Sequence, residues 1–404
     1  MKAGFSEVEA ERPAAMVLFN PAAELVLPGS VWHAVDEVRE GRTLPPTVMF
    51  FGTADKLLNA ARAFQEKAAH AKQRVQLYLA KDQPHGFFNE RDGRAEWHQS
   101  TTYLADRFLA TLGYTAGHPT MAFTAGSLAA LAPSAPVPPP GGPAREIAGA
   151  RLIGGVQYRN NKNQRQQLDL YLPESPAKTA SGRTPLVVWV HGGAWRGGNK
   201  LNLPAAYLLK KGFAVASVNY RLSGEAVFPA QLEDCQAALA WLRANAAAHS
   251  LDADRIGVWG SSAGGHLVAL LGLTANVQAV VDYYGPAHLA RMGEGPSTMD
   301  HDGPDSPESL LIGGPVQANQ DKAWKASPLS YVGQGPSAPF FIVHGDADPL
   351  VIVEQSELFH AALRKHNVES TLRIVPGGGH GGPQFQAPEM LDAVEAFFRR
   401  HLLK

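Results

Sequence analysis

The segment Gly260-Ser261-Ser262-Ala263-Gly264 sets a serine between two glycines, directly after an apolar run and directly before a stretch of helical periodicity. Small neighbours allow a sharp turn that exposes the hydroxyl of Ser262, and the start of the following helix favours developing negative charge. Such a serine is suited to nucleophilic attack on a carbonyl carbon. The alternative is a glycine turn that only packs a helix on a strand, and the other motifs of the chain decide between the two.

A candidate acid and a candidate base follow this serine along the chain, the acid before the base. His380 lies among glycines after the last predicted strand, and imidazole accepts and returns a proton near neutral pH. The loop after the preceding strand offers two carboxylates. We choose Asp348 as the acid because the following proline fixes its turn, and we interpret Asp346 as a turn-capping residue. The predicted catalytic set is therefore Ser262, Asp348 and His380.

The motif His191-Gly192-Gly193-Ala194-Trp195 follows an earlier predicted strand, where an oxyanion-binding loop is expected. The amides of Gly193 and Ala194, together with that of Ala263, are predicted to hold a tetrahedral oxyanion, and one such donor contributes about 10²- to 10³-fold to kcat. Trp195 is predicted to contact the substrate. The alternative is a plain turn with Trp195 as a core or rim aromatic.

Composition narrows the class of partner. With 36 basic and 37 acidic residues among 404, the formal net charge is -1, which gives no reason to expect nucleic acid or an anionic membrane. A small or neutral substrate is favoured. No spacing of histidine and acidic residues is typical of a metal site. The single cysteine, Cys235, excludes an intrachain disulfide, and its helical spacing from leucines indicates a packing role.

The N-terminal residues lack the apolar run of a secretory signal, and no segment is apolar for long enough to cross a bilayer. The chain as given is expected in the cytoplasm, and a longer precursor that is exported stays compatible with it. A proline- and alanine-rich stretch cannot hold a helix or an inner strand. We interpret residues 116–145 as a linker between an N-terminal segment, 1–115, and a catalytic domain, 146–404.

In the catalytic domain, apolar runs alternate with helix-length amphipathic stretches, which predicts a mostly parallel sheet with helices on both faces and a ligand site at the carboxyl ends of the strands. The strands are predicted at Val156–Arg159, Gln167–Leu172, Pro185–Val190, Phe213–Tyr220, Arg255–Trp259, Val277–Tyr284, Pro339–Val343 and Ser370–Val375. The helices are predicted at Leu203–Lys211, Pro229–Ala248, Ala263–Leu273, Val353–His366 and Ala387–His401. The catalytic motifs all fall at strand ends.

These motifs, with Asn219-Tyr220-Arg221 and Tyr284-Gly285-Pro286, resemble the α/β-hydrolase superfamily, and within it the esterases that include hormone-sensitive-lipase-like carboxylesterases, acetylxylan and feruloyl esterases and kynurenine formamidases. The resemblance covers nearly all of residues 146–404. It implies an eight-stranded α/β-hydrolase fold and two-step acyl transfer through an acyl-Ser262 enzyme, without cofactor or metal. Ala194 stands where many lipase-like relatives have a third glycine, a variant that is closer to the polysaccharide-side-chain esterases and the formamidases.

The resemblance implies a serine carboxylesterase for small acyl esters, among them acetyl or feruloyl groups on plant carbohydrate. An arylformamidase is the alternative enzyme, and a non-catalytic binding module on the same fold is the alternative of another class. Substrate choice is expected to depend on residues 287–332, which are rich in Gly, Pro, Asp and Ser. The candidate pocket residues there are Met292, Met299, Leu310, Leu311 and Trp324.

The N-terminal segment resembles the last three strand-helix units of a second esterase, without a nucleophile. Asp55 is followed by His85 after 30 positions, much as Asp348 is followed by His380 after 32. We expect Asp55 and His85 to be outside catalysis. The segment is a remnant of a tandem esterase, a cover for an edge of the main sheet, or part of a substrate entrance or a homodimer interface.

Overall fold

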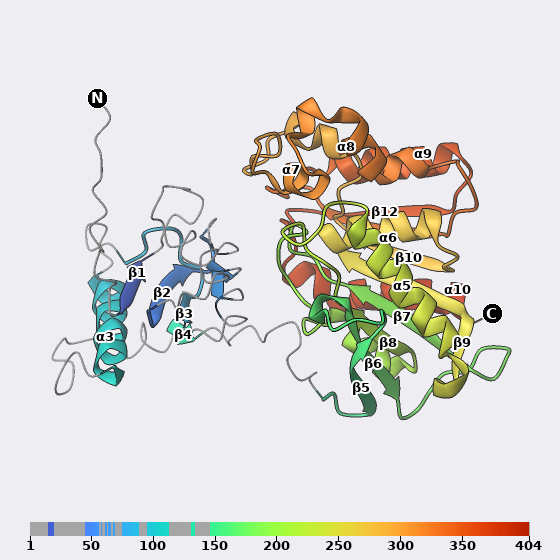
Figure 1. The fold of residues 1–404 in the computed structure, drawn as a ribbon, viewed down its shortest axis with the longest axis horizontal. Helices are drawn as coiled ribbons and strands as arrows, with labels where there is room; N and C mark the ends of the chain where they lie inside the picture. Colours follow the sequence, from blue (N-terminus) through green and yellow to red (C-terminus); the bar gives the residue numbers. More distant parts are fainter. Residues whose placement is uncertain are drawn as a thin grey trace. The chain divides into compact units, whose positions relative to one another are not determined.

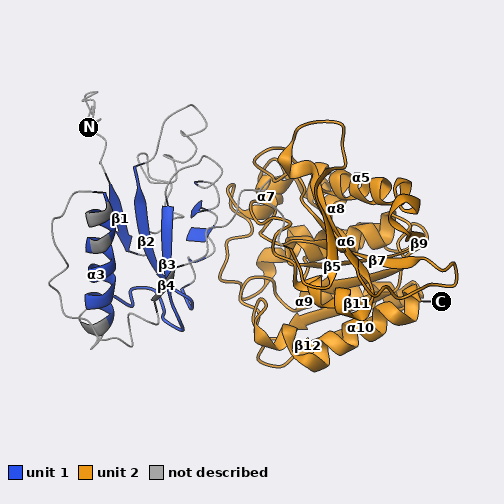
Figure 2. Cartoon of the chain, turned by 90° about the horizontal axis from the view of Figure 1, so that it is seen from below, with its two compact units in different colours: residues 1–139 blue, residues 140–404 orange. Residues whose placement is uncertain are grey.

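The computed structural model describes residues 15–19, 45–55, 75–88, 95–112, 131–133 and 146–403, with residues 58, 61, 62, 64, 65 and 68. The chain divides into two compact units, residues 1–139 and 140–404 (Figure 2). The division falls within residues 116–145, which the sequence predicts as a linker. This stretch also contains a short edge strand of unit 1 at Leu131–Pro133, so it is not a linker throughout. No described helix is long and apolar enough to cross a membrane.

Unit 2 is built on an eight-stranded sheet in the order β12-β11-β10-β9-β7-β8-β6-β5 (Figure 1). The six strands from β12 to β8 are parallel to their neighbours, whereas β6 and β5 join antiparallel at one edge. The predicted fold class is confirmed. The strands are β5 (Ala150–Gln157), β6 (Gln167–Pro173), β7 (Thr184–Val190), β8 (Ala214–Val218), β9 (Leu251–Ser261), β10 (Ala279–Tyr283), β11 (Phe340–Gly345) and β12 (Ser370–Val375).

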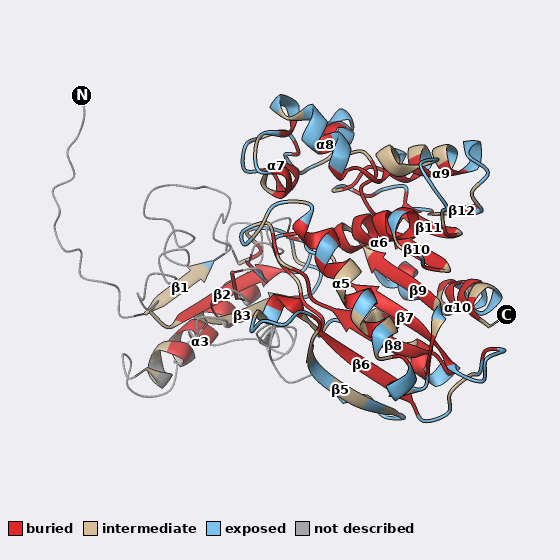
Figure 3. Ribbon diagram, turned by 45° about the vertical axis from the view of Figure 1, so that its right-hand side comes forward, coloured by how far each residue is buried: buried red, intermediate tan, exposed pale blue. Residues whose placement is uncertain are grey.

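Helices cover both faces of this sheet, so its central strands are buried throughout (Figure 3). The first face carries α5 (Ala230–Ala244), α6 (Ala263–Thr274) and α9 (Glu354–Lys365), which share one apolar core with it. Cys235 lies in this core, as its spacing predicts. The other face carries α10 (Pro388–Leu402) and the 3-10 helix η3 (Pro204–Lys211). Continuous Val/Ile runs in the sequence reflect this double cover.

Two differences from the sequence prediction in unit 2 have a clear local cause or form. The first strand of unit 2 begins at Ala150, six residues before the predicted start. The prediction missed these residues because Gly154 and Gly155, which lie at a β-bulge inside the strand, interrupt its apolar pattern. The amide of Gly155 donates to Asp169 at 2.7 Å, so a side-chain acceptor replaces part of the strand ladder. The second difference is η3, which is a 3-10 helix rather than an α-helix.

The insertion between β10 and β11 is made of short helices without a strand. It comprises η5 (Leu289–Glu294), α7 (Pro307–Ile312), η6 (Val316–Ala318), α8 (Gln320–Ala326) and η7 (Pro328–Tyr331). Both ends of this insertion are tied to the carboxyl edge of the sheet, because β10 precedes it and β11 follows it. It is therefore positioned where ligands bind in open α/β sheets.

Unit 1 contains a four-stranded sheet in the order β1 (Met16–Phe19), β2 (Thr47–Gly52), β3 (Val75–Ala80) and β4 (Leu131–Pro133). The first three strands are parallel and β4 is antiparallel to β3. The helix α3 (Ala95–Thr111) packs on the sheet through an apolar cluster that includes Phe50 and Phe108.

A buried ion pair holds the segment that follows the predicted oxyanion loop. Nζ of Lys200 lies 2.6 Å from Oδ2 of Asp169, and both side chains are fully buried. The backbone amide of Lys200 donates to Asn219 Oδ1 at 2.7 Å. These bonds join the loop to β6 and to the segment after β8.

We predict that Lys200→Met lowers the free energy of unfolding of unit 2 by about 3–5 kcal/mol, because it leaves the carboxylate of Asp169 buried without its cation. Denaturant unfolding followed by near-ultraviolet circular dichroism measures this loss. Lys210→Met, at an exposed position of η3, is the control and changes stability by less than about 0.5 kcal/mol. Equal unfolding curves for the two variants would contradict the structural role of the pair.

Candidate active site

The turn between β9 and α6 holds Ser262 in a backbone conformation that few residues adopt, with φ 55° and ψ -124°. Two close approaches require glycine on either side of it. A Cβ atom on Gly260 would lie 2.3 Å from the carbonyl oxygen of Gly264, and one on Gly264 would lie 2.1 Å from that of Val190. The amide of Ser262 donates to Tyr283 at 2.8 Å. The turn is thus held rigidly in a strained form, a feature that recurs at functional sites.

Three loops from the carboxyl edge bring the predicted catalytic side chains into one hydrogen-bonded chain. Nε2 of His380 lies 2.8 Å from Oγ of Ser262, and Nδ1 of His380 lies 2.7 Å from Oδ2 of Asp348. Because a carboxylate only accepts, Nδ1 carries a proton and Nε2 of the neutral ring is free to accept the hydroxyl proton of Ser262. This is the tautomer that a general base requires.

Asp348 is held as an anion by its neighbours. Its Oδ1 accepts from the amides of Leu350 and Val351 at 2.8 and 3.0 Å. Burial alone would raise its pKa, but the hydrogen bonds from His344 and His380 outweigh this and hold the pKa well below its usual range. The carboxylate therefore stays charged at neutral pH and stabilises the imidazolium that forms when His380 takes a proton.

His344 is a positioning residue to which the sequence analysis gave no role. Its Nε2 lies 2.8 Å from the carbonyl oxygen of Val351 and 3.3 Å from Oδ2 of Asp348, and its Nδ1 lies 2.6 Å from Oγ of Ser356. The ring is fully buried at the end of β11. The sequence feature that could have indicated this role is the position of His344, four residues before Asp348 in the same motif.

Asp346, the other carboxylate of the loop, has a different position. It is exposed, and its Oδ1 accepts from the amide of Gly377 at 2.7 Å. It thereby ties the acid loop to the loop that carries His380, and it does not contact the imidazole. The structure thus brings Asp348, rather than Asp346, to His380.

The predicted oxyanion loop leaves β7 through backbone conformations in the left-handed region, with φ 115° at Gly193, 53° at Ala194 and 55° at Trp195. The amides of residues 196 and 197 both donate to the carbonyl oxygen of Gly193 at 2.9 Å and close the turn. Within the part of the chain that the structure describes, the amides of Gly193 and Ala194 donate to no protein acceptor. The amide of Ala263, the first residue of α6, has no acceptor inside its helix.

Trp195 is a correction to the sequence analysis. Its side chain is 1% exposed and lies in the core, where Nε1 donates to Nδ1 of His266 at 3.2 Å. Nε2 of His266 donates in turn to Ala326 in the insertion at 2.7 Å. Burial lowers the pKa of His266 to about 4, so the ring is neutral and accepts from the indole. Trp195 therefore fixes the predicted oxyanion loop to the core through His266, and its side chain does not face a substrate.

The predicted pocket residues of the insertion differ in how far they are exposed. Met292 and Leu311 are buried in the core, at 1% and 0% exposure, whereas Trp324 is 45% exposed. Met299 and Leu310 are half-buried. Spacing in a loop without periodicity does not tell which apolar side chains turn inward.

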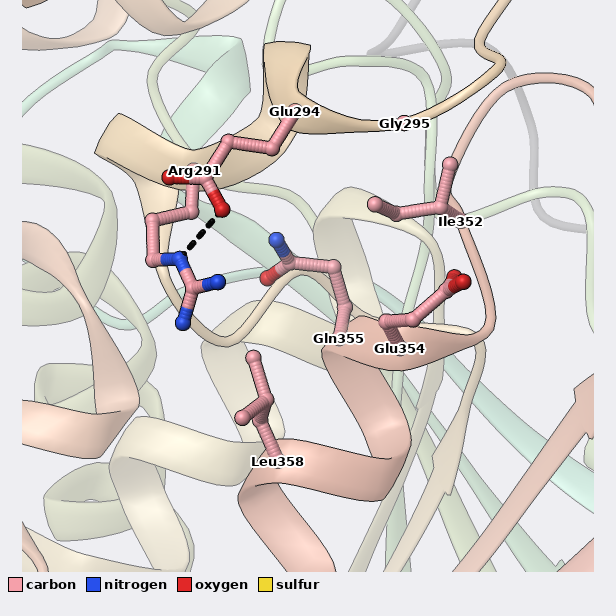
Figure 4. A pocket seen from close by; sticks show the side chains of 7 residues that line it. All are labelled: Arg291, Glu294, Gly295, Ile352, Glu354, Gln355 and Leu358. Atoms are coloured by element: carbon pink, nitrogen blue, oxygen red, sulfur yellow. Dashed lines mark hydrogen bonds and ion pairs between the residues drawn. The ribbon is translucent and has the colours of Figure 1, made fainter.

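A shallow pocket lies between the insertion and the start of α9 (Figure 4). An ion pair between Arg291 and Glu294 at 2.6 Å lies at one side of it, and Ile352 lies at the other. Gln355 accepts from the amides of Ala287 and His288 and so fixes the root of the insertion. The residues that line the pocket are Arg291, Glu294, Gly295, Ile352, Glu354, Gln355 and Leu358.

Unit 1 contains a second contact between an acid and a histidine. Nδ1 of His85 lies 3.2 Å from Oδ2 of Asp55, whose side chain is fully buried, while the side chain of His85 is 57% exposed. No serine of the described residues hydrogen-bonds to His85. Among the described residues, no group of three or more His, Cys, Asp and Glu side chains could hold a metal ion.

Comparisons with known proteins place relatives of this chain among esterases. Residues 168–363 match the family model BD-FAE. Esterase LipQ of Mycobacterium tuberculosis is 35% identical over 203 residues, which are 45% of this chain and 46% of the relative. A solved structure of a truncated carbohydrate esterase from gut microbiota is 30% identical, with a TM-score of 0.59, and the match covers 65% of this chain and 99% of that one. The chain belongs to the esterase branch of the α/β-hydrolase family.

Two further relatives extend the comparison. The probable carboxylic ester hydrolase LipM of Mycobacterium tuberculosis is 30% identical over 231 residues, 52% of each chain. A bifunctional GH43-CE protein of Bacteroides eggerthii is 34% identical, with a TM-score of 0.56, over 63% of this chain and 36% of that one. The chain spans about half the length of the curated relatives it matches.

We predict that Asp348→Asn lowers kcat for ester hydrolysis by about 10⁴-fold, because an amide at this place favours the wrong tautomer of His380. Asp346→Asn is the matched control. It weakens one exposed hydrogen bond and costs no more than about tenfold. Steady-state kinetics on a p-nitrophenyl ester measures both values, and a larger loss for Asp346→Asn would exchange the roles of the two carboxylates.

Proposed function

We propose that this chain is a serine carboxylesterase in which Ser262 forms the acyl-enzyme. The observation that carries the proposal is the hydrogen-bonded chain from Ser262 through His380 to Asp348. In the neighbouring loop, the amides of Gly193 and Ala194 have no acceptor among the described residues. The curated relatives named esterases support the class of reaction.

In the proposed first step, His380 Nε2 takes the proton of the Ser262 hydroxyl while Oγ attacks the ester carbonyl carbon. The carbonyl oxygen becomes an oxyanion that the amides of Gly193, Ala194 and Ala263 stabilise, and each such donor is worth about 3–4 kcal/mol in the transition state. The imidazolium of His380, stabilised by Asp348, then protonates the leaving alkoxide, and the alcohol departs.

In the second step, a water molecule takes the place of the alcohol. His380 removes one proton from the water, the resulting hydroxide attacks the acyl carbon, and the second tetrahedral intermediate collapses. The carboxylic acid departs and Oγ of Ser262 recovers its proton from His380. The balance of the two steps is one ester and one water to one acid and one alcohol.

For the substrate, we propose short acyl esters, with acetyl or feruloyl groups on plant carbohydrate as the natural class. The solved relatives described as a carbohydrate esterase from gut microbiota and as a GH43-CE protein support this choice. The near-zero net charge favours a neutral substrate. The insertion between β10 and β11 lies at the same sheet edge as Ser262 and is the segment expected to select the acyl or alcohol group.

The proposal predicts that p-nitrophenyl acetate and butyrate are hydrolysed faster than longer esters, and that acetylated xylan or methyl ferulate is also cleaved. N-formylkynurenine in the same panel tests the formamidase alternative. Ser262→Ala is expected to lower kcat by about 10⁶-fold because the nucleophile is lost. Cleavage of N-formylkynurenine alone would replace the proposed substrate class, and unchanged ester hydrolysis by Ser262→Ala would contradict the nucleophile.

We also propose that unit 1 is a partial second copy of the acid and histidine corner of this fold. Its strands β1, β2 and β3 have the same parallel order as β10, β11 and β12, and corresponding hydrogen bonds from backbone amides recur with lengths that agree within 0.1 Å. The matched pairs are Met16 N to Pro46 O at 2.9 Å and Val280 N to Pro339 O at 3.0 Å, Ala54 N to Gln83 O at 3.0 Å and Ala347 N to Gly378 O at 2.9 Å, Asp82 N to Thr53 Oγ1 at 2.7 Å and Gly377 N to Asp346 Oδ1 at 2.7 Å.

Because Ser262 already has a base in its own unit, we predict that His85→Ala leaves kcat and KM for esters unchanged within about twofold, whereas His380→Ala lowers kcat by about 10⁴- to 10⁶-fold. Steady-state kinetics on the full chain distinguishes the two histidines. Light scattering of the same samples measures the molar mass in solution and so tests the alternative that unit 1 forms a homodimer interface. A loss of activity in His85→Ala without loss of folded protein would bring unit 1 into the reaction.

A further inference from the structure

The insertion between β10 and β11 contains a buried histidine that the proposed reaction does not use. The ring of His301 is 3% exposed. Its Nδ1 lies 3.0 Å from Oε1 of Glu308 in the first turn of α7, and its Nε2 lies 2.9 Å from the carbonyl oxygen of Leu350. His301 therefore joins the insertion to the loop that follows Asp348.

Three polar groups face the ring of His301: Glu308, the carbonyl oxygen of Leu350 and the hydroxyl of Ser297, which lies 2.9 Å from Nε2. The carbonyl oxygen of Leu350 can only accept, and Ser297 donates its proton to the same oxygen at 3.0 Å. In this arrangement both ring nitrogens donate, which is the hydrogen-bond pattern of an imidazolium. Oε2 of Glu308 has no hydrogen-bond partner among the described residues, so His301 is the partner of this carboxyl group that the structure shows through Oε1.

With both ring nitrogens protonated, the cluster offers no base to a second serine in the insertion. Oγ of Ser297 lies 2.9 Å from Nε2 of His301 and, with Glu308, imitates a triad. However, an imidazolium has no lone pair with which to take the serine proton, and Ser297 donates its own proton to Leu350 at 3.0 Å. The cluster is therefore a structural connection and not a reaction centre.

The contacts of His301 and Ser297 hold the turn that follows the catalytic acid, Asp348. His301 and Ser297 contact the carbonyl oxygen of Leu350, while the amide of the same residue donates to Oδ1 of Asp348 at 2.8 Å. The backbone amide and the hydroxyl of Thr298 both donate to Pro349, at 2.7 and 3.0 Å. The residues from Asp348 to Val351, here called the acid turn, are thus held by the insertion on one side and bind the carboxylate on the other.

We propose that His301 is a positioning residue for the reaction: as a cation between Glu308 and Leu350, it holds the acid turn so that Asp348 faces His380. The proposal rests on the proposed esterase function of the site. It makes the insertion part of the catalytic framework in addition to its expected contact with substrate.

The charges around His301 give this connection a pH dependence. Glu308 from α7 and Asp302 from its own segment face the ring, and the acid turn carries Asp348. Burial lowers the pKa of His301, but the hydrogen bond and charge of Glu308 outweigh it and raise the pKa above its ordinary value. A raised pKa means that the connection is complete below the unfolded-state pKa and is lost as pH rises through the folded-state pKa.

The test is the pH profile of kcat for Glu308→Gln in the full chain. The amide keeps the shape of the side chain and an oxygen acceptor but removes the negative charge. The alkaline limb of the profile is expected to move down by about one to three pH units, while the KM and the acid limb, at which His380 becomes protonated, stay unchanged. His301→Gln is expected to lower kcat at every pH at which the wild-type cation is present.

Asp321→Asn, at an exposed carboxylate of α8 in the same insertion and outside the pocket of Figure 4, is the control and leaves the profile in place. Circular dichroism at each pH normalises the rates to folded protein. A Glu308→Gln profile that superposes on the wild-type profile would overturn the proposal.

Titration of the His301 ring by nuclear magnetic resonance provides a readout that does not need turnover. The expected result is a cation at neutral pH in the wild type and a lower pKa in Glu308→Gln. A neutral ring in the wild type at pH 7 would overturn the proposal even if the esterase is active, whereas absence of ester hydrolysis with a titrating cation would contradict the proposed function alone.

Discussion

The hydrogen bond between Nδ1 of His380 and Asp348 is the interaction on which the candidate site depends. It fixes the tautomer of the imidazole, so that Nε2 can accept the proton of Ser262, and it gives the resulting cation a partner. Everything around it supports a charged, immobile carboxylate: two backbone amides, the buried ring of His344 and, through the acid turn, the insertion. Residues from the insertion, from β11 and from the acid turn thus all position the carboxyl group of Asp348.

The second constraint is the closeness of the backbone at the carboxyl edge of the sheet. The Ser262 turn fits only because there are glycines on both sides of it. A Cβ atom on either glycine would clash with a neighbouring carbonyl oxygen. The oxyanion loop depends likewise on left-handed conformations, which Trp195 stabilises from the core side through His266. Preorganised amides of this kind favour the transition state because they need no rearrangement during the reaction.

Local sequence patterns were sufficient for the fold class and for the side chains that meet at the edge, because both depend on strand ends and glycine turns. Patterns did not locate what depends on the direction of a side chain. Trp195 and Leu311 were expected near substrate, yet each lies in the core. The contact of His301 with the acid turn joins positions 49 residues apart through an insertion without periodicity, so no local rule could have found it.

The central claim, an acyl-enzyme on Ser262, is tested most directly by trapping it. Rapid acid quench of the full chain with a slowly deacylating p-nitrophenyl ester, followed by peptide mass spectrometry, measures where the acyl group resides. The account predicts a burst of about one p-nitrophenolate per chain and an acyl group on the peptide that carries Ser262. An acyl group on another residue, or steady turnover with no modified peptide and no burst, would contradict it.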